Sequence, residues 1–252
     1  MRVRRVSVLA CLTVGMLLVN GCATVPDTAT PAAAQETPTR APNEQETSAP
    51  MPSPTPDPYP GWTMYSNPTY GISFRYPSTW FGPDVYEFED GVRLAVGSDT
   101  VYPYGTGPED RQPGAPNAYA IVIQYTTNTT GWTLEQARAE QPWINDTLAV
   151  LDMQDGQTTS TVRSLTTRVR ALTLGRFTGV EFTTTLSETA QTERFFMRSA
   201  FLMDDERNIL AINAAPENVE LADPATWRQG FEAVDASHRE TLYELIDSIE
   251  VD

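Results

Sequence analysis

Cys22 is the residue whose type and position in this chain point most directly to a chemical reaction. It follows Val19-Asn20-Gly21, at the end of an apolar run that begins at Val6. Three arginines stand ahead of that run, within residues 2–5. A basic start, a short apolar stretch and a small residue before the cut are typical of an export signal. Cleavage before Cys22 would place its thiol at the new N-terminus, where it could be acylated.

Residues 1–22 resemble a bacterial lipoprotein signal with its lipobox. The resemblance implies that residues 1–21 are removed and that Cys22 carries a diacylglycerol and an N-acyl chain. Two acyl chains hold a protein on a bilayer much better than one, so the expected location is the extracytoplasmic face of a cell membrane or outer membrane. Plain secretion and a retained anchor are the alternatives, although the apolar run is shorter than the roughly 20 residues that span a bilayer.

Few other side chains in the sequence could carry out a reaction. Cys11 lies in the signal, so the mature chain keeps no thiol for catalysis or for a disulfide. His238 is the only histidine, and the sequence has no Gly-x-Ser-x-Gly elbow, phosphate loop or G-x-G-x-x-G motif. We therefore expect a protein that is not an enzyme and that uses no cofactor or transition metal.

Acidic side chains give one candidate site for a hard cation. Asp204, Asp205 and Glu206 stand together in a turn-like segment, and Ca²⁺ prefers several oxygen ligands. The Asp-x-Asp-x-Asp-Gly pattern is absent, and a solvated turn explains the same residues. A calcium site therefore ranks behind a solvated turn.

The long segment 98–117 is the candidate binding loop. It holds Tyr102 and Tyr104 among prolines and glycines, and a loop of this length inside a compact domain is often functional. Exposed tyrosines can stack on a sugar ring or anchor a protein partner. The alternative is a proline-rich lid over apolar surface.

The negative net charge of the chain limits the kinds of molecule that it can bind. The chain has 33 acidic and 17 basic residues, for a formal net charge of −16. Such a protein repels nucleic acid. The expected partners are the bilayer, through the acyl anchor, and an envelope protein.

The composition divides the chain into three parts. After the signal and Cys22, residues 23–60 are rich in Pro, Thr and Ser and should form a disordered linker. Residues 61–252 are long enough for one domain with a substantial core. Apolar periodicity there predicts strands and two helices. The expected strands are 63–65, 71–76, 85–88, 92–96, 118–126, 173–186, 193–203 and 208–214, and the expected helices are 134–144 and 226–249.

The segment from Tyr65 to Trp80, Tyr-Ser-Asn-Pro-Thr-Tyr-Gly-Ile-Ser-Phe-Arg-Tyr-Pro-Ser-Thr-Trp, resembles the opening of PsbP-like domains. Residues 245–251 resemble their closing helix and serine-containing last turn. The resemblance implies an α+β fold in which helices flank an antiparallel sheet, an α/β/α sandwich, and a domain that is not catalytic. It implies no photosynthetic role.

Two functional hypotheses follow. The first is a membrane-tethered accessory protein that binds a partner protein or an envelope complex. The second is a module that binds a glycan, a small molecule or a divalent cation. A concave pocket lined by tyrosine, tryptophan and acidic residues would favour the second hypothesis.

Overall fold

The computed structural model describes residues 58–107, 110–112, 114–140, 142–161, 163–187 and 194–252. Within these residues an antiparallel sheet of eight strands has the order β3-β4-β5-β10-β9-β8-β7-β6. The strands of this sheet are β3 (Phe81–Phe88), β4 (Gly91–Gly97), β5 (Ala118–Thr126), β6 (Thr158–Ser160), β7 (Ser164–Leu174), β8 (Phe177–Leu186), β9 (Phe195–Met203) and β10 (Ile209–Glu217). The predicted signal, Cys22 and most of the predicted linker lie outside the described residues.

A smaller antiparallel sheet has the order β1-β2-β11. Its strands are β1 (Trp62–Asn67), β2 (Ile72–Pro77) and the two-residue β11 (Glu250–Val251). The helices are α1 (Leu134–Glu140), α2 (Pro142–Leu151) and α3 (Trp227–Asp247), and the 3₁₀ turn η2 (Pro224–Thr226) precedes α3.

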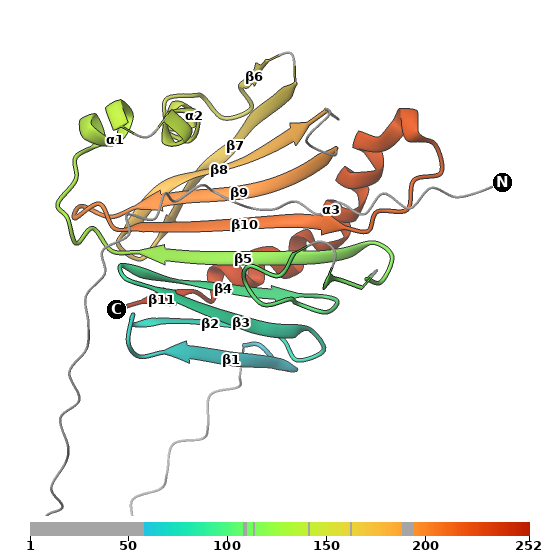
Figure 1. The fold of residues 1–252 in the computed structure, drawn as a ribbon, viewed down its shortest axis with the longest axis horizontal. Helices are drawn as coiled ribbons and strands as arrows, with labels where there is room; N and C mark the ends of the chain where they lie inside the picture. The colour runs from blue at the N-terminus through green and yellow to red at the C-terminus, as the bar shows by residue number, and fades with distance from the viewer. Residues whose placement is uncertain (1–57, 108–109, 113, 141, 162, 188–193) are drawn as a thin grey trace, which may run out of the picture. The chain divides into compact units, whose positions relative to one another are not determined.

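The helices lie on both faces of the large sheet (Figure 1). Helix α3 packs against β5, β9 and β10 and also against β2, and its Phe231 and Leu245 join one hydrophobic cluster with Leu202 of β9. Phe201, the neighbour of Leu202, belongs to a second cluster with Leu148 of α2. Adjacent residues of a strand point to opposite faces, so α3 and the α1–α2 pair cover opposite faces. The expected α+β fold is thus confirmed.

Two predicted elements are wrong in their extent. The expected helix 134–144 is two helices, because Pro142 has no N–H to donate and starts α2 at the position that tolerates proline. The expected strand 173–186 is the end of β7, a turn at Gly175 and then β8. β7 itself was missed, because its arginines and threonines hide the alternation of a strand. β7 pairs with β8, so the region of the expected strands 173–186, 193–203 and 208–214 holds one more antiparallel strand than expected.

The segment from Tyr65 to Trp80 contributes residues to the core. Phe74 is 1% exposed, and its ring centroid lies 5.5 Å from that of Tyr65 on the paired strand. Asn67 is buried, and its Oδ1 accepts hydrogen bonds from the backbone N–H groups of Thr69 and Tyr70. This closes the turn between β1 and β2.

The chain end is fastened to the same strand. Ser248 Oγ accepts a 2.8 Å hydrogen bond from the backbone N–H of Arg75 in β2. The N–H of Asp252 donates to the carbonyl of Gly71. The serine in the last turn therefore docks the end of α3 on β2.

A buried ionic network lies between α3 and the large sheet. Arg198 of β9 is 7% exposed and donates to Asp235 of α3, with Nη2 2.7 Å from Oδ2, and to Glu181 of β8, with Nη1 2.7 Å from Oε1. Tyr119 donates to Asp235 over 2.9 Å, and Tyr243 donates to Glu181 over 2.9 Å. The network fixes the position of α3 on the sheet.

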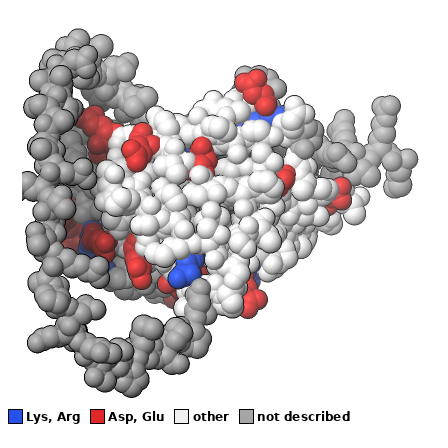
Figure 2. Space-filling view, turned by 90° about the horizontal axis from the view of Figure 1, so that it is seen from below, with Lys and Arg blue, Asp and Glu red and all other residues white. Residues whose placement is uncertain are grey.

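Most of the large exposed apolar side chains lie on β3 or on the loop after β4, and Met64 lies on β1. Met64, Phe81, Val85, Tyr86 and Tyr104 are each at least 37% exposed. Figure 2, seen from the side of β1, shows separate acidic side chains around a large uncharged area. None of the helices in the described part of the chain combines the length and apolar character that a membrane-spanning segment needs.

Candidate functional site

A pocket of about 270 Å³ lies between the loop after β4 and the large sheet. Its floor consists of small side chains: Ala95 of β4, Ala120 and Val122 of β5, and Ala215 of β10. Ala95 pairs with Val122, and Ala120 pairs with Ala215, so these residues form adjacent rows on one face. They alternate with buried residues of the α3-side cluster, so the floor lies on the face opposite α3. Small side chains on three neighbouring strands leave the space that the loop encloses.

Hydrogen bonds from the loop to itself and to the sheet hold the roof. The hydroxyl of Tyr102 accepts a 2.9 Å hydrogen bond from the N–H of Gln112 and donates to the carbonyl of the same residue. Asp99 Oδ2 accepts from the N–H of Ala115. The N–H of Asn117 donates to the carbonyl of Asn218, next to the end of β10. The hydroxyl of Tyr102 is thus used within the loop, and its ring is left to line the pocket.

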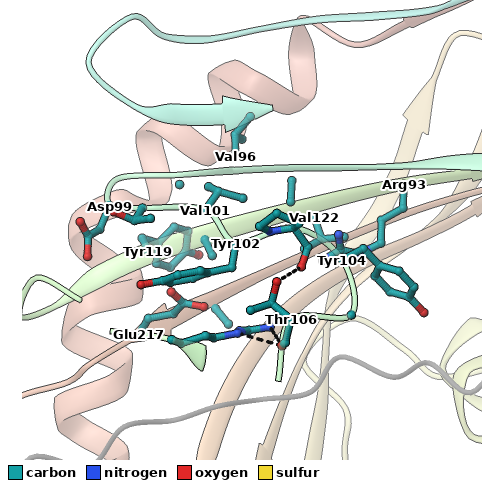
Figure 3. A pocket seen from close by; sticks show the side chains of 18 of the residues that line it. Arg93, Val96, Asp99, Val101, Tyr102, Tyr104, Thr106, Tyr119, Val122 and Glu217 are labelled. Carbon is teal, nitrogen blue, oxygen red and sulfur yellow. Dashed lines mark hydrogen bonds between the residues drawn. The ribbon is translucent and has the colours of Figure 1, made fainter. Parts of the chain in front are cut away.

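Arg93 and Tyr104 mark one end of the pocket (Figure 3). The Arg93 side chain is 16% exposed, and its Nη1 lies 3.5 Å from Asp84 Oδ2 but has no hydrogen-bond partner among the described residues. The guanidinium lies 5.0 Å from the centroid of the Tyr104 ring, which in turn packs on Tyr86 at 4.3 Å. Burial lowers the pKa of Arg93, and the nearby charge of Arg111 lowers it further, while Asp84 opposes the shift. Arg93 is therefore a poorly solvated cation.

Asp99 and Glu217 stand toward the other end, with the ring of Tyr102 between the two ends (Figure 3). Burial raises the pKa of Glu217; the charge of Arg111 opposes this and that of Asp99 adds to it. No hydrogen bond joins the Glu217 carboxylate to another described residue. This end therefore holds a partly buried carboxylate with no direct hydrogen-bond partner among the described residues.

Arg111 connects the two ends electrostatically. Its Nε and Nη2 donate to the carbonyl of Thr106 at 3.2 and 3.0 Å, and its guanidinium lies 5.6 Å from the centroid of Tyr102. It acts on the pKa of both Arg93 and Glu217, so the three charges belong to one site. The pocket thus presents opposite charges across an apolar floor.

The structure places the two predicted loop residues at this pocket. Tyr102 is half-buried and lines it, whereas Tyr104 is 46% exposed and lies at its edge. Both interpretations of the loop describe part of the structure, since it covers the sheet and also encloses a cavity. That Tyr102 and Tyr104 bind a ligand stays a prediction.

The acidic turn is structured differently from an open cation loop. Asp204 is 9% exposed, and its Oδ1 accepts from the N–H of Asn208. Its Oδ2 accepts from Asn208 Nδ2 at 2.7 Å and from Arg176 Nε at 3.1 Å. Among the described residues no group of three or more metal-ligating side chains converges. Among the described residues, the structure therefore brings no further metal-ligating group to Asp205 and Glu206 that would support the calcium hypothesis.

His238 lies away from the pocket, on α3. Its ring stacks on Tyr119 with centroids 4.9 Å apart and meets the edge of Trp80 at 6.1 Å. Burial lowers its pKa, although a hydrogen bond with the backbone of Asn117 and the charge of Asp235 oppose the shift. It packs between aromatic rings, beside the buried network.

Sequence reasoning missed Arg93, Arg111 and Glu217 as parts of one site. A signal was present, because Arg93 interrupts the apolar strand Gly91–Gly97 on one face. Nothing in the sequence, however, indicates that β4 and β10 both flank β5, and that arrangement is what brings Arg93 and Glu217 to the same face.

Comparison with known proteins adds little to the assignment. No family model and no curated protein sequence matches the chain. Several solved structures match the chain, and two of them illustrate the low identity. The solution structure of cyanobacterial PsbP (CyanoP) from Synechocystis sp. PCC 6803 is 12% identical over 81% of this chain and 100% of that one, with a TM-score of 0.35. A crystal structure from Bacteroides thetaiotaomicron VPI-5482 is 11% identical over 76% of this chain and 49% of that one, with a TM-score of 0.32. These values are too low to carry an argument about function.

Proposed function

We propose that this chain is a lipid-anchored, non-enzymatic binding module that holds a small polar ligand in the pocket beneath residues 99–107. The observation that carries the proposal is the pocket itself, whose apolar floor is bordered by charged side chains, Arg93 at one end and Glu217 at the other. A mostly apolar cavity with a few polar groups around it is the usual form of a small-molecule site. This pocket moves the second sequence-based hypothesis, ligand binding, ahead of protein binding.

A thermal-shift screen of the purified full-length chain against small polar compounds tests ligand binding. A compound that binds the folded state raises the melting midpoint. In Ala120→Leu, a larger side chain fills the floor of the pocket, so the shift should disappear. Ala171→Leu, at an exposed position of β7, is the matched control and should keep the shift. A screen without hits, or hits that Ala120→Leu leaves unchanged, would remove the proposal.

The anchor forms the second half of the proposal. The segment before Cys22 has the features of an export signal, and an acylated Cys22 would keep the module at the membrane surface on the extracytoplasmic side. We expect Cys22→Ser to move the protein from the membrane fraction to the soluble fraction of the cell. Cys11→Ser, which changes the other cysteine inside the signal, should leave it in the membrane fraction. If Cys22→Ser stayed with the membrane, the anchor would have to be another one.

Protein docking is the second candidate function, and exposed apolar side chains favour it. Tyr86 of β3 and Tyr104 of the loop are 37% and 46% exposed, and their rings lie 4.3 Å apart beside the pocket. Exposed apolar patches often mark protein interfaces. A photo-crosslinking side chain at Tyr86 should capture one reproducible envelope protein in intact cells, and the same group at the exposed Thr173 should not. Equal labelling at both positions would exclude this surface.

A further inference from the structure

The pocket beneath residues 99–107 combines a floor of small side chains with an aromatic side chain from the loop. We infer that its ligand carries a planar aromatic ring, which lies between the ring of Tyr102 and the floor. This inference rests on the proposed binding function and adds the class of ligand. It depends on the extent of the floor, on the fixed ring of Tyr102 and on the hydrogen bonds inside the loop.

The floor is free of large side chains because neighbouring strands present small residues side by side. Ala120 of β5 pairs with Gly97 of β4 and with Ala215 of β10. In the next row on the same face, Ala95 pairs with Val122. All five residues line the pocket. Strands lie about 4.8 Å apart, and residues on one face follow every ~7 Å along a strand, so the floor measures about 10 Å by 7 Å. One ring or two fused rings would cover such an area.

The volume of the pocket agrees with a ring of this size. The pocket holds about 270 Å³. An apolar cavity of about 150 Å³ already takes up benzene. The pocket therefore has room for an aromatic ring together with a small polar substituent.

The ring of Tyr102 is held in place by two kinds of contact. Its hydroxyl accepts a hydrogen bond from the N–H of Gln112 at 2.9 Å and donates to the carbonyl of the same residue at 3.3 Å. The guanidinium of Arg111 lies 5.6 Å from the ring centroid, within the range of a cation–π contact. Because the ring is already fixed, a ligand that stacks on it immobilises little more of the protein.

The hydrogen-bonding groups of the loop are engaged with one another. The hydroxyl of Thr106 donates to the carbonyl of Pro103 over 2.7 Å, and Nε and Nη2 of Arg111 donate to the carbonyl of Thr106. Asp99 Oδ2 accepts from the N–H of Ala115. A sugar needs partners for the hydroxyl groups around its ring, whereas an aromatic ring is recognised through its faces and edges. The pocket therefore suits an aromatic ring better than a sugar.

Calorimetric titration of the full-length chain with matched pairs of neutral compounds tests the inference. The pairs are benzamide with cyclohexanecarboxamide, and 2-naphthamide with its decahydro analogue; each pair shares the amide group and differs in the ring. Neutral compounds are used because the field of a chain with a net charge of −16 would act on a charged one.

We expect the aromatic member of at least one pair to bind about three- to tenfold more tightly than the saturated member, because ring stacking adds to the burial of apolar area that both share. Glucose and N-acetylglucosamine, as neutral sugars, should bind more weakly than the aromatic amides.

Two variants at Tyr102 locate the ring of the ligand. Tyr102→Leu removes the aromatic side chain, so the preference for the aromatic member should disappear while the saturated member still binds. Tyr102→Phe keeps the ring and loses only the hydrogen bonds to Gln112, so the preference should remain. Tyr86→Leu is the matched control and should also keep the preference, because Tyr86 is exposed and lies outside the described lining of the pocket.

The same variants show whether Tyr102 acts only by holding the loop. If Tyr102→Leu abolishes binding of both members of a pair, or if Tyr102→Phe loses the preference, the role of Tyr102 is structural and the inference is wrong. If the preference survives in Tyr102→Leu, the aromatic ring does not bind on Tyr102 and the inference is equally wrong.

The outcomes separate this inference from the proposed function. If sugars or saturated amides bind as tightly as the aromatic amides and Ala120→Leu abolishes that binding, the pocket is a ligand site but the assignment of an aromatic ring is wrong. The same holds if the amides do not bind and the thermal-shift screen yields only hits without an aromatic ring. If no compound of any class binds, both fail.

Discussion

Replacing Arg198 by methionine tests whether the buried network fixes α3 on the sheet. Arg198 donates to two carboxylates, Asp235 of α3 and Glu181 of β8, and each of their side chains is only 1% exposed. Methionine has a similar length and no charge, so Arg198→Met keeps most of the packing and leaves both acids without their shared partner.

The expected loss of stability depends on the hydrogen-bond partners that Glu181 and Asp235 keep without Arg198. Glu181 keeps Arg170 Nε at 2.7 Å, and Asp235 keeps Arg239 Nη2 at 3.1 Å. The side chains of these two arginines are 44% and 43% exposed, so water screens them. Removing one partner of a buried ion pair costs about 3–5 kcal/mol. We expect Arg198→Met to lower the free energy of unfolding by roughly this amount, and the exposed Arg163→Met to change it by less than about 0.5 kcal/mol.

The pH dependence of this loss gives a sharper test. Burial raises the pKa of Asp235, but the hydrogen bonds and charge of Arg198, with Tyr119 and Arg239, outweigh it and hold the pKa below its usual value. Without Arg198, burial dominates and the pKa rises. A folded state with the raised pKa binds more protons than the unfolded chain, so the variant gains stability as the pH falls. The difference between variant and wild type should therefore be smaller at pH 5 than at pH 7.5.

Urea unfolding of the full-length chain, followed by tryptophan fluorescence at both pH values, measures the effect. Adding Glu181→Gln and Asp235→Asn to Arg198→Met removes the buried charges together and should recover part of the loss. A loss below about 1 kcal/mol for the single variant, or an equal loss at pH 5 and pH 7.5, would refute the role given to this network.

Two further predictions concern α3 and the sheet. The pKa of His238 is lowered in the folded protein, so the unfolded chain binds a proton at this residue more readily. The melting midpoint should therefore fall from pH 7.5 to pH 5.5, and His238→Gln should reduce that fall. An unchanged pH profile in the variant would contradict the prediction. In β8, a Cβ on Gly179 would overlap the carbonyl oxygen of Phe201, so Gly179→Ala should cost about 1–3 kcal/mol in urea unfolding. The control is Gly105→Ala, which meets no atom within 4 Å and bears only the strain of its positive φ; a smaller loss at Gly179 than at Gly105 would argue against the overlap.

The sequence was most informative where a local pattern has one structural solution. A run rich in β-branched residues after a proline- and glycine-rich loop predicted β5 at its observed bounds, Ala118–Thr126, and most of its residues are buried. The expected helix from 226 to 249 agrees with α3, since its apolar residues recur at helical spacing. β7 escaped notice, because an edge-proximal strand with half-exposed residues has no strong apolar face.

The candidate site was only partly predictable, for a physical reason. Tyr102 and Tyr104 could be chosen because a long loop with exposed aromatic residues is a local feature. Arg93 and Glu217 could not be assigned to the same site as these tyrosines, because the sequence between them does not show how far apart they lie in the folded chain. The same holds for the bonds of Arg198 to Asp235 and Glu181, in which charged residues stand at positions that the strand pattern assigns to the core.

The sequence by itself determined the acidic character and the α+β class, because net charge and apolar period can be read from single segments; its signal-like start also predicts a membrane-anchored location. Only the tertiary structure decided which charges share a pocket and which form a buried network. Strand order brings β4, β5 and β10 side by side, and the docking of α3 lays Asp235 over Arg198. Both depend on long-range packing, in which residues far apart in the chain meet because their apolar faces must be covered together.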